Sequence, residues 1–434
     1  MKFAKIILVL ILIFSFYGCA TESGEVAKRP GGPYTVIKGG LLIDGTGREP
    51  IPNSVVVIEG SIIKAVGTLG QVTIPSGAII IEAKNKIVLP GLIDMHVHYT
   101  RAWMDQLFIS HGVTTVRDVG STLDYYILQE REKSRIEGVK KPRIYTSGPI
   151  IDGSPPIFET VSYPVTTPEE AKSAVYKLIN SKVDCIKTQQ KITPPLLKAI
   201  MEVAKKEKVI VTVHLRDTKA KTAILLGIKG LEHISGINFL TAPQSELEEV
   251  SDMIISHSVF VVATLILDET CSKLLDPELQ KDPLLKKVPP EALKRLFSSW
   301  ETTFGVGKWW TEDHSNRSRT ILGRKKEFIR ILIKKGGSGL IVAGSDVTAA
   351  YVFPGGSLHR ELELLVSAGL TPMQAIMAAT KNASELLGHA DRLGTLEAGK
   401  IADVLILSAN PLDNISNTKS IEMVLRDGKM IWKK

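Results

Sequence analysis

Cysteine is scarce in this sequence, and its scarcity limits what can hold the fold together. Only three cysteines occur in 434 residues, namely Cys19, Cys185 and Cys271. Cys19 falls in a distinct N-terminal segment, so the body of the chain keeps one distant pair. Such a pair provides no disulfide framework of the kind that stabilises small secreted domains. The fold must therefore depend on a hydrophobic core, for which the chain is long enough.

A basic surface interleaved with aromatic residues is also missing. The formal charge is +8, and part of the excess comes from lysine pairs such as Lys140-Lys141 and Lys334-Lys335. Nucleic-acid binding is therefore not expected. Charged residues make up 23% of the chain and hydrophobic residues 44%, which is typical of a globular protein and not of a disordered one.

The first residues form a separate module. Lys2 and Lys5 precede an apolar run at 6–17, which has signal-peptide length and is too short for a comfortable membrane span. The run ends in Gly18-Cys19, which resembles the lipobox of bacterial lipoproteins, where the cysteine is lipidated. We expect a signal peptide at 1–19, lipidation at Cys19, a flexible tether at 20–33 and an exported lipoprotein anchored to a membrane of the bacterial cell envelope. An uncleaved anchor and an ordinary secretory signal are the alternatives.

Short β-strand patterns occupy both ends of the remaining chain. From residue 34 to 88, β-prone runs such as SVVVIEGSIIKAVG alternate with Gly, Asn and Pro. The same pattern occurs near the C-terminus in IEMVLRDGKMIWKK. These two flanks predict one small β-sandwich domain built from residues 34–88 and 393–434. The segment between them, 89–392, is then a second and larger domain.

The larger segment alternates predicted strands with predicted helices. Thr167 and Thr371 each begin a capping box with proline at the next position, and the second of these helices is expected to run to Gly388. Strands are predicted at 92–98, 113–118, 143–147, 183–188, 209–214, 231–234, 259–264 and 340–345. Eight β-then-α units predict an α/β fold, a parallel (β/α)8 TIM barrel with its chemistry at the C-terminal strand ends. The long segment 265–324 is expected to form a lid over the mouth.

The stretch IVLPGLIDMHVHYT ends an apolar strand pattern with two histidines. Side chains alternate along a strand, so Asp94, His96 and His98 share one face. Two adjacent imidazoles are costly to bury unless something uses their nitrogens, and a divalent metal ion does so. Two surface histidines near a strand end are the alternative interpretation.

Residues able to bind metal also stand at four other predicted strand ends. Lys187 lies near the end of the fourth strand, His214 ends the fifth, His233 the sixth and Asp346 the eighth. Because the C-terminal ends of barrel strands meet at one rim, these side chains should converge with the histidine pair. Each alone has a structural explanation, such as a buried core histidine or a helix-capping aspartate, but together they predict a metal site.

Taken as a set, these motifs resemble the amidohydrolase superfamily of metal-dependent hydrolases. LPGLIDMHVH, the fourth-strand lysine, the two single histidines and the eighth-strand GSD match its binuclear pattern, and GTLEAGKIADVLIL looks like its return to a β-sandwich. LHRELELLVSAGLTPMQAIMAATKNASELLG is similar to the imidazolonepropionase-like and prolidase-like branch. The resemblance covers about residues 34–434.

The resemblance implies two divalent metal ions, expected to be Zn²⁺, and a set of ligands. One ion would be held by His96, His98 and Asp346, the other by His214 and His233, with Lys187 between them as a carbamate formed with carbon dioxide. A carbamate makes the site less positive than a neutral lysine does, and so easier to bury. A mononuclear site, in which Lys187 pairs with Asp346 or a substrate carboxylate, is the alternative.

The implied activity is metal-dependent hydrolysis of an open or ring amide in a small molecule, most simply a dipeptide or an N-acyl amino acid. Asp346 would be the general acid and base. Tyr99, Arg101 and His359 are candidate substrate contacts, and an arginine at the mouth can fork onto a carboxylate.

Other functions fit parts of the same pattern. Phosphotriester or lactone hydrolysis could use a similar site, and a non-catalytic envelope binding protein could keep the barrel alone. Deaminases of this superfamily usually have Glu three residues after the fifth-strand histidine and lack the lysine. Here Asp217 stands three residues after His214 and Lys187 is present, so deamination is disfavoured. The sequence leaves oligomerisation open.

Overall fold

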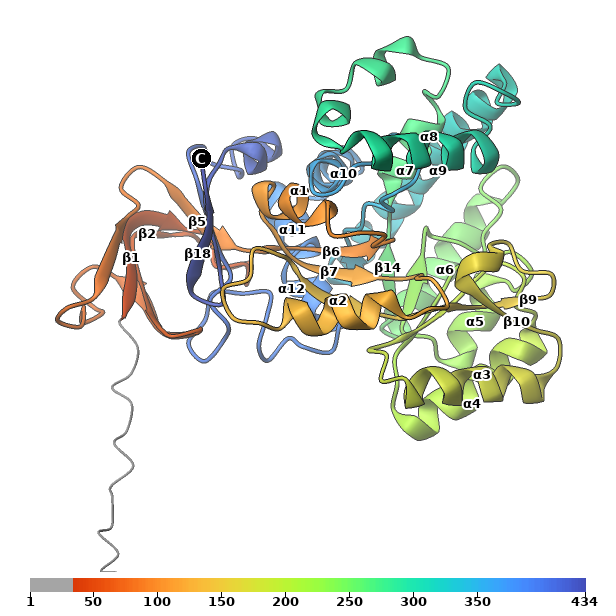
Figure 1. Ribbon diagram of the computed structural model, residues 1–434, viewed down its shortest axis with the longest axis horizontal. Coiled ribbons are helices and arrows are strands. Elements are labelled where there is room, and N and C mark those ends of the chain that lie inside the picture. Colours follow the sequence, from red (N-terminus) through yellow and green to blue (C-terminus); the bar gives the residue numbers. More distant parts are fainter. Residues whose placement is uncertain (1–33) are drawn as a thin grey trace, which may run out of the picture. The chain divides into compact units, whose positions relative to one another are not determined.

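The computed structural model describes residues 34–434, and both ends of this segment contribute strands to one mixed β-sheet (Figure 1). Its strands are β1 (Thr35–Leu42), β2 (Ile51–Glu59), β3 (Ile62–Thr68), β4 (Ile79–Glu82), β5 (Ile87–Pro90), β16 (Val404–Leu407), β17 (Ile421–Arg426) and β18 (Lys429–Lys433). The order is β18-β17-β16-β5-β1-β2-β3, with β4 paired to β1. The ends of the chain meet where β16 runs antiparallel to β5. The strand pairing here gives one sheet, so a two-sheet sandwich and its domain boundaries stay predictions.

Both faces of this sheet are buried near its centre. Ile37 and Val56 pack on one face together with Val404 from the C-terminal strands, whereas Val36 and Val55 pack on the opposite face. Since neighbouring residues of a strand point to opposite faces, two covered faces require apolar residues at consecutive positions. This explains why β2 carries the unbroken run VVVI.

Parallel strands alternate with helices between these flanks, which confirms the predicted α/β class. A three-stranded sheet contains β6 (Leu92–Val97), β7 (Val113–Asp118) and β8 (Arg143–Thr146). A seven-stranded sheet has the order β10-β9-β11-β12-β13-β14-β15. Its members are β9 (Ile150–Gly153), β10 (Ser162–Val165), β11 (Ile186–Thr188), β12 (Val211–Val213), β13 (Gly230–Glu232), β14 (Phe260–Val262) and β15 (Ile341–Val342). Every strand predicted between residues 92 and 345 is present, and β9 and β10 are additional.

The parallel strands form two separate ladders and not one closed sheet. Backbone hydrogen bonds nevertheless reach across both interruptions. Asp184 N, shortly before β11, donates to Thr146 O at the end of β8 at 2.8 Å. Asp346 N, in the loop after β15, donates to His96 O in β6, also at 2.8 Å. The order of strands is that expected of the barrel, but the pairing is broken at these two places.

The helices follow the strands in alternation. They are α1 (Met104–Ser110), α2 (Tyr126–Ser134), α3 (Pro168–Asn180), α4 (Pro194–Glu207), α5 (Ala220–Leu226), α6 (Gln244–Ser256), α7 (Leu265–Cys271), α8 (Pro290–Thr303), α9 (Glu312–Lys334), α10 (Gly356–Ser367), α11 (Pro372–Ala378) and α12 (Lys381–Leu386). Short 3₁₀ helices are η1 (Glu159–Val161), η2 (Pro277–Lys281), η3 (Pro283–Lys287), η4 (Gly337–Leu340) and η5 (Ile415–Lys419). The predicted capping boxes are present at the starts of α3 and α11.

The prediction of one helix from Thr371 to Gly388 is wrong, because the segment forms α11 and α12 with a break between them. At the break, Ala378 O accepts a hydrogen bond from Ala343 N at 3.0 Å, and Ala379 O accepts one from Ile93 N at 2.7 Å. Carbonyl groups that face the strands beside them cannot also accept the next bonds of a helix. The strands therefore interrupt a sequence with otherwise continuous helical character.

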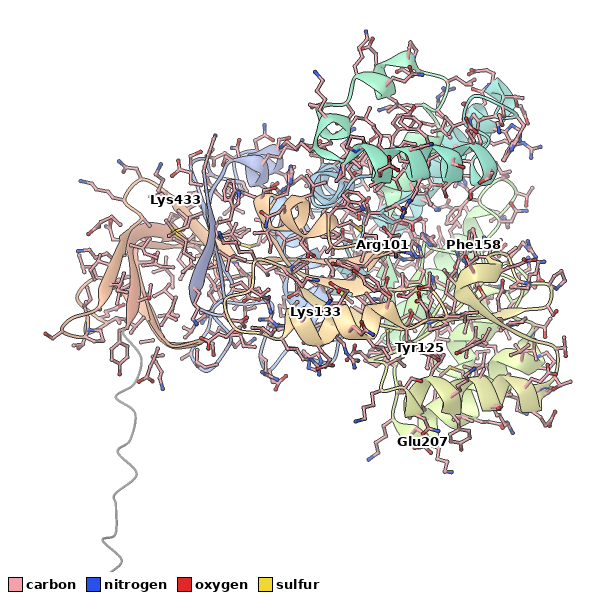
Figure 2. All side chains as sticks on the ribbon, in the orientation of Figure 1. Arg101, Tyr125, Lys133, Phe158, Glu207 and Lys433 are labelled. Carbon is pink, nitrogen blue, oxygen red and sulfur yellow. The ribbon has the colours of Figure 1, made fainter. Side chains whose placement is uncertain are left out.

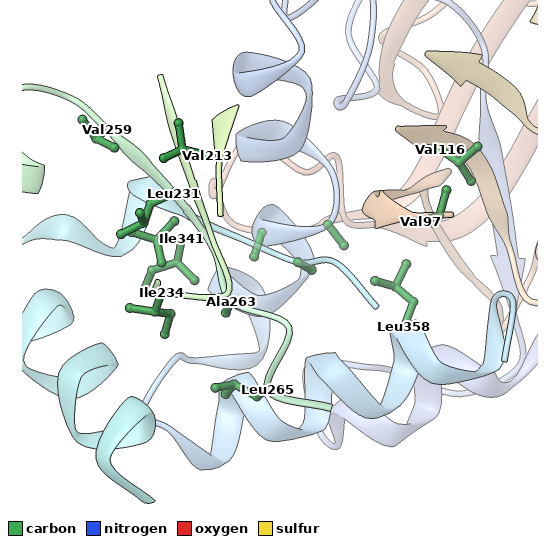
Figure 3. Close-up of a cluster of buried hydrophobic side chains, with 14 of the residues drawn as sticks. Val97, Val116, Val213, Leu231, Ile234, Val259, Ala263, Leu265, Ile341 and Leu358 are labelled. Carbon is green, nitrogen blue, oxygen red and sulfur yellow. The ribbon is translucent and has the colours of Figure 1, made fainter. Parts of the chain in front are cut away.

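The main core lies between the parallel strands and the surrounding helices (Figure 3). Val213, Leu231 and Ile341 reach into it from β12, β13 and β15, and Leu265 and Leu358 come from α7 and α10; all five are buried. Each such side chain contributes roughly 1.5–3 kcal/mol when fully buried. This core fixes the strand ends that carry the polar residues described next.

The predicted signal peptide, Cys19 and the tether lie outside the described residues. Within residues 34–434, none of the helices combines the length and the apolar character needed to cross a bilayer.

Candidate metal centre

A cavity of about 760 Å³ brings the predicted metal ligands together. Six of the side chains that line it are the predicted ligands, namely His96, His98, Lys187, His214, His233 and Asp346. They come from the ends of five parallel strands: the pair from β6, then one residue each from β11, the end of β12, the end of β13 and the loop after β15. Side chains far apart in sequence thus meet at one rim, as parallel strand ends do.

The ligand atoms converge closely. The Nε2 atoms of His96 and His98 each lie 3.3 Å from Asp346 Oδ1. The ring of His233 is 4.3 Å from that of His96 and 4.5 Å from that of His214, between centroids. One ligand atom each from His96, His233 and Asp346 all lie within 4.8 Å of one another. Donors that share a tetrahedral ion at about 2.1 Å are separated by about 3.4 Å, so this spacing suits a metal.

His96 is oriented by Glu232, which the sequence did not single out, and through it by Arg117, which ends the second predicted strand. Its Nδ1 lies 2.7 Å from Glu232 Oε2, and Glu232 Oε1 accepts a hydrogen bond from Arg117 Nη2 at 2.6 Å. A carboxylate only accepts, so Nδ1 carries a proton, and in the neutral imidazole Nε2 then presents a lone pair. The available signal was a glutamate inside an otherwise apolar strand, directly before the sixth-strand histidine.

The structure provides a direct test of whether these residues fit a metal. Nε2 of His96 is buried and forms no hydrogen bond with another described atom, although Asp346 Oδ1 lies 3.3 Å away. With the proton on Nδ1, both facing atoms are acceptors. Two buried acceptors at this distance are unfavourable unless a cation compensates them. The residues therefore fit a divalent ion.

Two further histidines are fixed in the same tautomer. Nδ1 of His98 lies 3.3 Å from Gly120 O, which can only accept. Nδ1 of His233 lies 2.7 Å from the hydroxyl of Thr264, and that hydroxyl donates to Ala263 O at 2.9 Å. In both rings Nδ1 therefore carries the proton, and Nε2 is the ligand atom.

Burial also sets the charges of the site. Burial lowers the pKa values of His214 and His233 well below the ordinary value, so both imidazoles are neutral. Burial alone would raise the pKa of Asp346, but His96 and His233 outweigh this effect and hold the pKa well below its usual range. Burial alone would lower the pKa of His98, but Asp346 outweighs this effect and raises it. The result is an anionic carboxylate beside the neutral nitrogen donors of His214 and His233, which suits metal binding.

Lys187 is 1% exposed, and burial lowers its pKa. Within residues 34–434 its Nζ forms no ion pair, because no carboxylate oxygen lies within 4.0 Å of it. A buried lysine without a counter-ion is stabilised as the neutral amine, which is the form that reacts with carbon dioxide. In the described geometry Lys187 and Asp346 therefore form no ion pair.

Asp94 shares β6 with His96 but is used structurally. Its carboxylate accepts hydrogen bonds from Ser345 N at 2.9 Å and from Ser345 Oγ at 2.6 Å. Burial raises the pKa of Asp94 to about 6. The contact ties β6 to the segment that carries Asp346, and so holds the two halves of the ligand set in register.

Two of the predicted substrate contacts line the cavity. The hydroxyl of Tyr99 donates to Asp105 Oδ1 at 2.9 Å and accepts from Lys141 Nζ at 3.0 Å. Its donor is therefore already used by a neighbouring side chain of the protein. Arg101 is exposed, and its guanidinium lies 5.2 Å from the centroid of the Tyr126 ring. No ion pair joins Arg101 to a carboxylate in the described chain. Arg101 is therefore the better-placed of the two for a substrate.

The third predicted contact, His359, is not placed at the cavity. It is fully buried on α10, where its Nδ1 lies 2.9 Å from Thr418 Oγ1 and its Nε2 lies 3.0 Å from His111 O. Both ring nitrogens are engaged, and burial lowers the pKa of His359 to about 3. The expectation of a substrate contact is not supported, because this histidine joins α10 to the segments packed against it.

The segment 265–324 forms part of the cavity wall through α7, α8 and the turn after α8. The lining residues from this segment are Leu267, Ser299, Thr302, Thr303 and Phe304. The indole Nε1 of the buried Trp300 donates to Thr348 O at 3.0 Å, which anchors α8 to the loop after Asp346. Ile157 and Phe158 extend the apolar lining on another side, and Figure 2 labels Phe158 and Arg101.

Comparison with known proteins places this site in a family. The model of the amidohydrolase family matches residues 87–431. Ochratoxinase of Aspergillus niger is 25% identical over 469 aligned residues, covering 91% of this chain and 86% of that protein. Its crystal structure is similar with a TM-score of 0.68 at 22% identity, covering 92% of this chain and 96% of that one. A crystal structure of a Xaa-Pro dipeptidase with bound methionine gives a TM-score of 0.71 at 23% identity, covering 92% and 100%.

Adenine deaminase of Paracoccus denitrificans is 30% identical, but over 156 residues that cover 34% of this chain and 26% of that protein. Such a partial match does not extend to the whole site. The family model, by contrast, spans most of the described residues and all six side chains of the cavity rim. This chain therefore belongs to the amidohydrolase family and is a hydrolase of carbon–nitrogen bonds.

Proposed function

We propose that this protein hydrolyses the amide bond of a small substrate that carries a carboxylate, a dipeptide or an N-acyl amino acid. The observation that carries the proposal is the pair of buried acceptors, His96 Nε2 and Asp346 Oδ1, that face each other at 3.3 Å in a cavity rimmed by four further ligand-type side chains. The fold shared with a Xaa-Pro dipeptidase and the similarity to ochratoxinase support a substrate of this class.

Two divalent ions, expected to be zinc, would be held by the rim residues. The ligands would be His96, His98 and Asp346 for one ion and His214 and His233 for the other, with Lys187 between them as a carbamate. When bound, such ions lower the pKa of water toward neutrality and polarise a carbonyl group.

Asp346 is the residue that moves the proton. Its carboxylate is ionised, and Oδ1 lies at the centre of the rim, within 3.3 Å of both β6 histidines. It takes the proton from the attacking water as the new C–O bond forms. It then delivers that proton to the leaving nitrogen as the C–N bond breaks.

Arg101 is the residue proposed to bind the substrate carboxylate. Stacking on Tyr126 fixes one face of the guanidinium, and Nη1 donates to Thr100 O at 2.6 Å, which leaves the remaining N–H groups available. Replacement of Arg101 by Met is expected to lower kcat/KM about 10- to 100-fold for an N-acyl amino acid, since a charge-assisted hydrogen bond contributes about 1.5–3 kcal/mol. The matching carboxamide substrate should lose little.

The control for Arg101 is Arg216→Met, a second arginine near the rim whose Nε already donates to Asp217 at 2.9 Å. This variant should keep kcat/KM within about twofold, because loss of an exposed ion pair has small effects. An equal loss on the acid and the carboxamide in the Arg101 variant would show that Arg101 does not recognise the carboxylate.

The experiment that tests the proposed function is a library of dipeptides and N-acyl amino acids, assayed with zinc and bicarbonate and again after chelation. Turnover of carboxylate-bearing amides that disappears with the metal supports the proposal. Metal-free protein with undiminished turnover, or activity confined to phosphotriesters or lactones, contradicts it.

We also infer that the eight parallel strands enclose a barrel.

We further infer that Cys19 anchors an exported lipoprotein, and this inference rests on the N-terminal sequence. In a bacterial host, Cys19→Ala is expected to move the protein from the membrane fraction to the soluble fraction or to leave an uncleaved precursor. Fractionation with radiolabelled palmitate measures this. A Cys19→Ala variant that still incorporates label and stays with the membrane would contradict the assignment.

A further inference from the structure

A buried ion pair lies behind His96. The side chains of Arg117 and Glu232 are 2% and 0% exposed, and they come from β7 and β13. Glu232 uses both carboxylate oxygens, one toward Arg117 Nη2 at 2.6 Å and the other toward His96 Nδ1 at 2.7 Å. Arg117 Nε donates to Met95 O at 2.8 Å, in the residue before His96. The contacts close a ring across three strands.

The pair is arranged so that each charge is compensated. An isolated buried carboxylate is strongly unfavourable, and a guanidinium beside it offsets that cost. Because Arg117 and Glu232 together are neutral, they place no net charge behind the metal ligands. The backbone contact to Met95 fixes the guanidinium relative to β6, the same strand that carries His96.

We propose that Glu232 is a positioning residue of the metal centre, which keeps the proton of His96 on Nδ1, and that Arg117 holds Glu232 in place for this task. The inference rests on the metal-binding part of the proposed function. A carboxylate is required because two acceptor atoms are needed, one for the guanidinium and one for the imidazole N–H. An amide has a single oxygen and cannot serve both.

The first test is Glu232→Gln. If the amide oxygen faces Arg117, the NH₂ group faces His96 Nδ1 and donates to it, which moves the imidazole proton to Nε2 and blocks metal binding there. If the oxygen faces His96, two donors meet at Arg117. We expect the affinity of the metal-free protein for Zn²⁺ to fall about 10- to 100-fold, the range typical of residues that orient metal ligands.

A double variant separates this role from a merely structural one. In Arg117→Met with Glu232→Gln, no guanidinium competes for the amide oxygen, so that oxygen is free to accept from His96 Nδ1. The double variant is therefore expected to bind Zn²⁺ about tenfold more tightly than Glu232→Gln alone. A purely structural role predicts the opposite, since two buried substitutions then disturb the core more than one.

The matched control is Glu361→Gln, which changes another fully buried carboxyl group, one whose pKa burial raises to about 8. Glu361 accepts from Ile266 N at 2.8 Å, and no hydrogen bond or ion pair joins it to the six rim residues in the described structure. The zinc affinity of the Glu361→Gln variant should equal that of the unmodified protein. All variants are tested as full chains. Competition with a chromophoric chelator measures their zinc affinity, and thermal unfolding in the presence of a chelator verifies their fold.

The outcomes distinguish failure of the positioning role of Glu232 from failure of the proposed function. If the unmodified chain binds Zn²⁺ and Glu232→Gln binds it equally well, or if the double variant is no tighter than the single one, the role of Glu232 is refuted and the proposed function stands. If the unmodified chain binds no zinc, both fail. A weakened single variant with recovery in the double variant supports the positioning role, whatever the substrate turns out to be.

Discussion

Replacement of Asp346 by Asn is expected to abolish most turnover, lowering kcat about 10²- to 10⁴-fold, while zinc remains bound. Asparagine has nearly the same shape, and its amide oxygen can still face the Nε2 atoms of His96 and His98, which lie 3.3 Å from Oδ1 in the native chain. The amide cannot accept the proton of the attacking water, however, and so cannot pass it to the leaving nitrogen. Steady-state kinetics with metal analysis of the same sample measures both effects.

The control for this variant is Asp217→Asn, which changes the acid three residues after His214. Its Oδ1 accepts from Arg216 Nε at 2.9 Å, its side chain is 38% exposed, and it is not among the cavity-lining residues. An amide hydrolase should keep kcat within about twofold in this variant. A loss in Asp217→Asn with retained turnover in Asp346→Asn would instead favour the deaminase arrangement.

The metal-ligand candidates could be found from sequence because their positions follow from local rules. Alternation along a strand places His96 and His98 on one face, and the parallel order of strands brings the ends that carry Lys187, His214 and His233 to the same rim. These rules need only the period of a strand and the direction of its neighbours. They therefore hold although the pairing is broken beside β8 and β15.

The supporting contacts could not be found in this way. Glu232 meets His96 across 136 residues of sequence and Arg117 across 115, and neither spacing carries a local signal. The break between α11 and α12 likewise depends on which backbone N–H groups lie beside Ala378 and Ala379. His359 shows the converse limit. Its type and place suggested a substrate contact, but partners at His111 and Thr418 use both nitrogens.

The strands β9 and β10 were missed for a related reason. Each has four residues, and the stretch between them begins Ser154-Pro155-Pro156, which reads as a loop. Their pairing is set by the neighbouring strand, since Ile151 in β9 lies opposite Thr188 in β11. An edge pair of this kind gains its stability from the sheet that it joins and not from its own sequence.

Two buried lysines near the site predict opposite behaviour. Lys187 forms no ion pair with a carboxylate in residues 34–434, whereas Lys325 Nζ lies 2.7 Å from Asp268 Oδ2. The Nζ of Lys325 is therefore occupied by its contact with Asp268. Burial lowers the pKa of Lys187, which favours the neutral amine that can form a carbamate with release of one proton. Such a carbamate would supply the anion that the proposed binuclear site requires.

Replacement of Lys187 by Ala is therefore expected to lower kcat at least about 100-fold and to weaken zinc binding, and added acetate or propionate should restore part of both. The shortened side chain leaves space for a free carboxylate where the carbamate stood. Lys325→Ala should show no such rescue, since its lost group was a cation. If alkylamines rescue Lys187→Ala and carboxylates do not, the lysine acts as an ammonium beside a single metal. The binuclear assignment would then be wrong, because no anion would join the two halves of the rim.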